Sequence, residues 1–83
     1  MQNQVGFTIR KKRKSNGLAQ GELASSVGMT QTWLSLVERG QFVPSPEMVK
    51  EIHRNIFRLV KLKSDIADAQ AKAAAEIIAN YNS

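Results

Sequence analysis

The segment from Gln20 to Arg39 constrains the fold of this 83-residue chain more than any other. Apolar residues recur at helical spacing on both sides of Gly28, which is free to adopt a positive φ and so to form a tight turn. Residues 31–39 divide into an apolar side and a polar side when they are wound at 100° per residue. Leu34 and Val37 form the apolar side. We expect them to pack against Leu23, Val27 and Met29, with Ala24 small enough to let the two helices approach. The pattern therefore predicts two short helices packed at a corner, with a polar outer face on the second.

The residues before this corner predict one more helix. Val5 and Ile9 lie at helical spacing, and the run from Gly6 ends at Asn16 and Gly17, a pair that favours a left-handed helix stop.

The residues after the corner predict a long helix. Ser45 is a suitable N-cap, Pro46 suits the first helical position, and Glu47 places an acid where the helix dipole favours it. No glycine or proline occurs beyond Met48, and apolar residues recur every three or four positions. We expect helix as far as Tyr81, either unbroken or with a break near residues 64–65.

The charge of the chain is positive and unevenly placed. Twelve Lys and Arg residues stand against seven Asp and Glu, a formal net charge of +5, and eleven of the twelve basic residues precede Ser64. A basic region of this kind suits a polyanion, although charge alone leaves nucleic-acid binding and simple solubility both open.

Several functions are excluded or disfavoured by composition. Cysteine is absent, so disulfides, thiolate nucleophiles and cysteine-bound metals cannot occur. His53 is the only histidine and has no second ligand at a suitable spacing, so we expect no metal site, no cofactor and no small-molecule ligand. No side chain has the partners of a nucleophile or general base, so we expect no enzymatic activity. The short apolar runs and the polar N-terminus predict a cytoplasmic protein with no membrane segment.

The corner, which includes Leu36 and is followed by Gly40 and Pro44, resembles the helix-turn-helix of phage repressors and Cro-type regulators. The resemblance covers roughly residues 5–56. It implies an all-α, lambda-repressor-like bundle of four to five helices with a long C-terminal helix, and it implies double-stranded DNA as the partner.

The resemblance also assigns roles to residues. Gln31 would read a base, and its carboxamide matches the N6 and N7 edge of adenine; the further base-reading candidates are Thr32, Ser35 and Leu36. The candidates for phosphate binding are Gln20, Thr30, Arg39 and Lys14. Arg13 and Glu38 would form an internal ion pair that keeps the Glu38 carboxylate away from phosphate. Trp33 is expected to pack against the first helix or the N-terminal segment.

Four residues depart from the family pattern. Ala19 stands where a capping Ser, Thr or Asn is usual, at a cost of about 1 kcal/mol. Gly21 weakens the same helix by up to about 1 kcal/mol relative to Ala. Phe42 and Val43 replace polar or basic loop residues.

We divide the chain into a DNA-binding domain, residues 1–62, and a C-terminal helix, residues 63–83, for dimerisation or partner binding. The expected dimer seam consists of Ile66, Ala69, Ala73 and Ile77, and the alternative is a helix that folds back over its own core. A twofold dimer would place two recognition helices roughly 34 Å apart on an inverted-repeat operator and repress by occluding a promoter. The alternative to a DNA-binding repressor is a protein-interaction module, such as an antitoxin or antirepressor, whose C-terminal helix binds a protein partner.

Overall fold

The computed structural model describes residues 4–82, with side chains as far as residue 79. These residues form four α-helices and no strand, which confirms the all-α class and the four-helix version of the prediction. The helices are α1 (Gln4–Ser15), α2 (Gln20–Ser26), α3 (Gln31–Glu38) and α4 (Pro46–Asn82).

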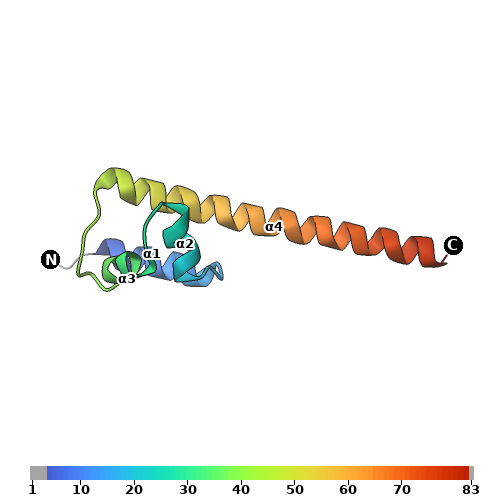
Figure 1. Cartoon of the computed structure of the whole chain (residues 1–83), viewed down its shortest axis with the longest axis horizontal. Coiled ribbons are helices and arrows are strands. Elements are labelled where there is room, and N and C mark those ends of the chain that lie inside the picture. The colour runs from blue at the N-terminus through green and yellow to red at the C-terminus, as the bar shows by residue number, and fades with distance from the viewer. Residues whose placement is uncertain (1–3, 83) are drawn as a thin grey trace.

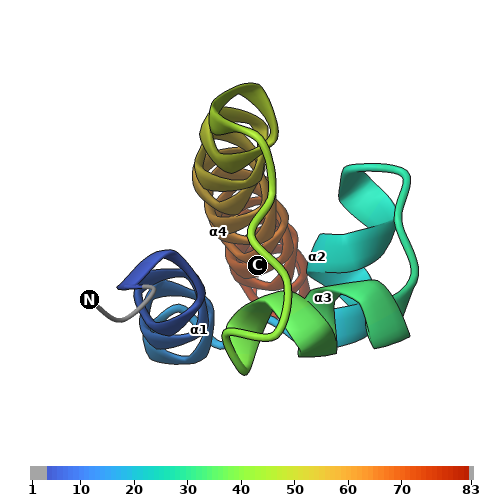
Figure 2. The same cartoon turned by 90° about the vertical axis from the view of Figure 1, so that its left-hand side faces the viewer.

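The first three helices gather on one side of the first part of α4, and α4 then continues alone (Figure 1). Seen along α4, helix α1 lies on one side of the cluster and α2 on the other, with α3 below (Figure 2). The molecule is consequently elongated, with extents of 64 × 21 × 19 Å. We call residues 4–60 the head and residues 61–82 the tail.

The predicted helix ends are present in the structure. The Thr30 hydroxyl accepts a hydrogen bond from the Trp33 amide at 3.1 Å, and the Ser45 hydroxyl accepts one from the Met48 amide at 3.1 Å. Gly28 has a φ of +75°, as the turn between α2 and α3 requires. Ala19 offers no side-chain cap to α2.

The core of the head lies where all four helices meet. It is apolar and draws on every helix, and its buried members are Ile9, Leu18, Leu23, Ala24, Leu34, Val37, Ile52 and Ile56. Leu34 and Val37 pack inward as the sequence predicts, so the opposite face of α3 points out of the head.

Gly6 marks the closest approach between two helices. A Cβ atom at this position would lie 1.9 Å from the Val37 carbonyl oxygen and 2.9 Å from the Val37 carbonyl carbon. Only glycine therefore allows α1 to lie directly against the backbone of α3.

One contact between α3 and the loop after it was not among the sequence expectations. The Trp33 ring contacts Phe42, with ring centroids 6.1 Å apart, because the loop after Gly40 folds back along α3. We expected Trp33 to pack against α1 or the N-terminal segment. Phe42, noted above as a departure from the family's loop, thus serves as a packing partner for this indole.

Helix α4 is unbroken, so the version with an interruption near residue 64 is wrong. Each residue from 61 to 79 is exposed. Two ion pairs hold the start of the tail: Lys63 Nζ lies 3.1 Å from Glu22 on α2, and Lys61 Nζ lies 3.5 Å from Asp65. Glu22 also accepts a hydrogen bond from the Ala19 amide at 3.3 Å, which compensates in part for the missing cap.

His53 on α4 is partly buried beside α1. Its Nδ1 atom is buried without a hydrogen-bond partner, and it lies in a small recess whose lining includes Lys12 and Asn16. Burial lowers the pKa of His53, and the positive charge of Lys12 lowers it further.

This lowered pKa predicts acid sensitivity between pH 7 and 5. The unfolded chain takes up a proton near the ordinary histidine pKa of about 6.5, whereas the folded chain does so only at lower pH. The stability present above about pH 6.5 is therefore lost as the pH falls through this window. We expect the melting temperature of the native chain to fall from pH 7 to 5 and that of His53→Gln to stay nearly flat. Equal slopes in the two proteins would contradict the assignment.

Candidate nucleic-acid interface

The outer face of α3 presents polar groups to solvent. Gln31 and Thr32, in its first turn, are exposed. One turn further on, Ser35 and Leu36 are half-buried, and Arg39 beyond the helix end is exposed. The hydrophobic contacts of Leu34 and Val37 on the inner face fix the rotation of α3 about its own axis, and so fix which residues face outward.

Five of the predicted site residues surround one shallow depression. Its lining consists of Gln20, Gln31, Thr32, Ser35 and Arg39. Leu36 and Thr30 are not part of that lining, although Thr30 lies just before α3 and caps it. The predicted base-reading and phosphate-binding residues thus meet at the junction of α2 and α3.

A chain of hydrogen bonds links the head interior to Gln31. Glu38 receives two bonds from Arg13, from Nε at 2.7 Å and from Nη2 at 2.9 Å. Gln20 Nε2 donates to Glu38 Oε1 at 3.1 Å. Gln31 Nε2 in turn donates to Gln20 Oε1 at 3.4 Å. The Gln31 amide is thereby oriented, through Gln20, by the buried ion pair of Arg13 and Glu38.

The Arg13–Glu38 pair is shielded from water. The two side chains are 10% and 2% exposed, and the third donor of Arg13, Nη1, bonds the Leu18 carbonyl oxygen at 2.9 Å. Hydrogen bonding to Glu38 raises the pKa of Arg13, so the guanidinium keeps its positive charge. This bidentate geometry joins α1 to the end of α3 and satisfies both charges.

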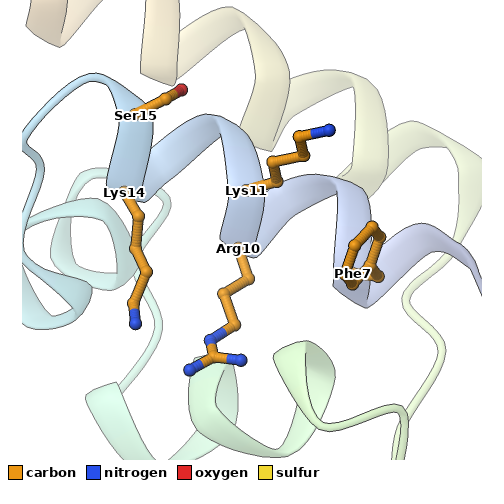
Figure 3. A pocket seen from close by; sticks show the side chains of 5 residues that line it. All are labelled: Phe7, Arg10, Lys11, Lys14 and Ser15. Carbon is orange, nitrogen blue, oxygen red and sulfur yellow. The ribbon is translucent and has the colours of Figure 1, made fainter.

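Cations from α1 extend the depression on one side. Arg10 and Lys14 line an adjoining recess together with Gln20, Ser35 and Arg39. Figure 3 shows Arg10 and Lys14 extending from the same side of α1, whereas Lys11 extends elsewhere. Lys14 was a predicted phosphate-binding residue, and Arg10 was not. The spacing of four residues, which places Arg10 and Lys14 on one helix face, is the signal that could have identified it.

The arrangement suits an anionic partner that displays hydrogen-bonding edges. Gln31 uses one amide hydrogen on Gln20 and keeps the other, together with Oε1, for a bidentate contact. Arg39 donates through Nε to the Ser35 carbonyl at 3.3 Å, which leaves both terminal amino groups for an anion. Basic side chains flank the amide and hydroxyl groups, as in surfaces that bind the phosphates and bases of nucleic acid.

Other kinds of site find little support within residues 4–82. No group of three histidine, aspartate or glutamate residues in this part of the chain could hold a metal ion. None of its helices is long and apolar enough to cross a membrane.

The geometry of α2, α3 and their exposed face defines a helix-turn-helix DNA-binding protein. A family profile described as helix-turn-helix matches residues 9–57, which include α2, α3 and most of α1. The chain belongs to this family of DNA-binding transcriptional regulators, of the Cro/C1 type, as the sequence resemblance indicated.

Two relatives each match more than half of the chain. The ImmF control region 10 kDa protein of Bacillus phage phi105 is 40% identical over 48 residues, which are 58% of this chain and 53% of the phage protein. An uncharacterized HTH-type transcriptional regulator of Methanothermobacter thermautotrophicus is 40% identical over 50 residues, 60% of this chain and 72% of that protein. The match thus spans about half the length of the phage relative. No solved structure matches the chain.

Proposed function

We propose that the chain is a sequence-specific repressor that binds an inverted-repeat operator as a homodimer, with α3 in the major groove. The observation that carries this proposal is the grouping of Gln31, Thr32 and Ser35 on an exposed face flanked by cations. Bound there, the protein would occlude a promoter. A role in the cytoplasm, at the nucleoid, follows from this proposal.

Within the site, we propose that some residues contact bases and others contact phosphates. Gln31 would contact adenine, and Thr32, Ser35 and Leu36 would contact neighbouring base edges or thymine methyl groups. The proposed phosphate contacts come from both sides of α3, and they are Arg10, Lys14, Gln20, Thr30 and Arg39. Thr30 accepts a bond as the helix cap, and its hydroxyl hydrogen can still be donated to a phosphate.

The proposed boundary between the two parts of the chain lies near residue 62. Ile56 is the last buried residue, Leu59 and Val60 are half-buried, and every residue from 61 to 79 is exposed. Ile66 and Ile77 are 49% and 67% exposed, and Ala69 and Ala73 are exposed between them. An apolar row on a solvated helix supports self-association through the tail.

Selection from random duplexes at a stated salt concentration tests the proposal. We expect a palindromic consensus, because a twofold dimer presents the same α3 to each half-site. A reporter gene downstream of that consensus should then be repressed by the protein. Enrichment of no sequence, or activation of the reporter, would contradict the proposal.

Arg10 supplies a separate prediction. Removing one phosphate contact weakens binding to every duplex alike and lowers the slope of log K against log salt by about 0.9. We therefore expect Arg10→Ala to reduce the slope by about that amount while keeping the consensus unchanged. Arg54→Ala is a matched control, because Arg54 is exposed on α4 and pairs with Glu51. Equal slopes for the two variants would show that Arg10 does not contact DNA.

A further inference from the structure

The outer face of α1 carries an exposed phenylalanine among cations. Phe7 is 60% exposed, and it lines an open recess of about 520 Å³ together with Arg10, Lys11, Lys14 and Ser15. The lining of this recess is mostly apolar, because the ring and the aliphatic stems of the long basic side chains form it. We call Phe7, Arg10, Lys11 and Lys14 the α1 patch. The patch has an apolar centre and a positive rim, and both are open to solvent.

The geometry of the helix places the phenylalanine ring between the cations. Wound at 100° per residue, Phe7 lies about 40° from Lys11 on one side and about 60° from Arg10 on the other. Figure 3 shows the same division, because Lys11 extends on one side of α1 and Arg10 and Lys14 extend on the other. Along the axis, the three charges lie about 4.5 to 10.5 Å beyond the ring, toward the C-terminal end of α1. A partner lying along α1 would therefore meet the ring first and positive charge over the next two turns.

The cations of the α1 patch have no acidic partner within the described residues. The ion pairs found there engage Arg13, Arg54, Lys61 and Lys63. Helix α1 itself contains no aspartate or glutamate. On α4, by contrast, Phe57 is 73% exposed, but the cations three residues before it and four residues after it are each paired with an acid. The positive charge of the α1 patch is consequently available to carboxylates of another molecule.

The proposed DNA contacts use only one side of this patch. Arg10 and Lys14 line the recess that adjoins the depression beside α3, whereas Phe7 and Lys11 do not. A phosphate backbone offers charge but little apolar surface to cover a ring, so DNA does not account for Phe7. An exposed apolar centre rimmed by polar groups is typical of a surface that binds protein.

We propose that the α1 patch binds an acidic helix of another protein, and that this helix excludes DNA. A helix laid antiparallel along α1 has the same rise per residue and presents side chains one and two turns apart on one face. An aliphatic side chain would cover Phe7, and carboxylates four and seven residues before it would lie level with Lys11 and with Lys14. The antiparallel direction also brings the acidic N-terminal end of the partner to the basic C-terminal end of α1, as the two helix dipoles favour.

The effect on DNA binding rests on the proposed function, because it assumes that Arg10 and Lys14 contact phosphates. The same cations cannot serve a carboxylate and a phosphate at once, and the charge of the bound acidic helix would repel DNA as well. The partner would therefore act as an inhibitor that releases the protein from its operator.

Titration with a designed peptide tests the docking site without DNA. The probe is an alanine-based helical peptide of about 18 residues, with two glutamates three residues apart and a leucine four residues after the second. Amide NMR shifts of the full chain at low salt report where it binds and how tightly. We expect shifts centred on residues 7–15, and a dissociation constant about tenfold lower than that of the same peptide with serine in place of leucine. Equal constants for the two peptides, or shifts centred elsewhere, would overturn the site.

Matched variants of exposed residues test which side chains form the site. Phe7→Ser should bind the leucine and serine peptides equally, whereas Phe57→Ser on α4 should keep the tenfold preference. Lys11→Glu should weaken binding of the leucine peptide about fivefold more than Lys50→Glu, which makes the same change of charge on α4. Circular dichroism checks that each variant folds, and the lysine pair carries the test if Phe7→Ser does not. A leucine preference that survives Phe7→Ser, or equal losses in the two lysine variants, would contradict the proposal.

Competition with a labelled duplex tests the inhibition. The leucine peptide should displace the duplex from the native chain and from Phe57→Ser, and about tenfold less well from Phe7→Ser. A Phe7→Ser protein whose own duplex affinity falls as far as that of Arg10→Ala would assign the ring to the DNA interface and overturn the inference. If the native chain binds no duplex, the proposed function fails, and the peptide titration still decides the docking site.

Discussion

Gly6→Ala is expected to lower the free energy of unfolding by about 3 kcal/mol, a large share of the stability of a domain this small. Alanine is the better helix former by about 1 kcal/mol, but its methyl group would lie 1.9 Å from the Val37 carbonyl oxygen. Since both sides of this contact are backbone, relief requires α1 and α3 to separate. Urea denaturation followed by circular dichroism measures the effect.

Gly21→Ala is the matched control for this experiment. Gly21 also lies inside a helix, but a Cβ there would meet only the flexible Gln31 amide at 3.4 Å. We expect this variant to be as stable as the native chain or up to about 1 kcal/mol more stable. A Gly6→Ala protein that unfolds at the same urea concentration as Gly21→Ala would refute the close packing of α1 on α3.

Glu38→Ala is expected to destabilise the head by about 3–5 kcal/mol. The substitution leaves the Arg13 guanidinium buried without its counter-charge, and Gln20 loses the acceptor of its amide. Arg13→Met combined with Glu38→Leu removes both charges and should recover most of the loss, because an apolar pair fills the site without desolvating an ion. Thermal unfolding of the single and double variants measures the coupling. Purely additive losses would contradict a buried, mutually dependent pair.

The corner of α2 and α3 could be predicted from the sequence because several independent signals agree there. The apolar residues of both helices, the turn at Gly28 and the cap at Thr30 all favour the same arrangement, and each is local in the chain. The outward direction of Gln31 and Thr32 follows from the inward direction of Leu34 and Val37.

Contacts between distant segments were harder to predict. The need for glycine at position 6 depends on the position of the α3 backbone, which no local pattern records. The contact of Trp33 with Phe42 depends on the path of the loop after α3. Arg10 joins the interface because α1 lies across the end of α3, so its role required the packing of the whole head. Similarly, the helix signal near residue 64 was weak, and the i, i+4 pair of Lys61 and Asp65 favours continuity there.

The most direct test of the central claim, that the exposed face of α3 reads bases, is the binding of Gln31→Ala to the selected duplex and to an unrelated duplex. We expect a loss of about 1–3 kcal/mol on the selected site, little change on the unrelated one, and a relaxed preference at one position of each half-site. Gln41→Ala, an exposed glutamine outside the depression, should bind both duplexes as the native protein does. If Gln31→Ala retains full affinity and full sequence preference, α3 does not read DNA through this side chain.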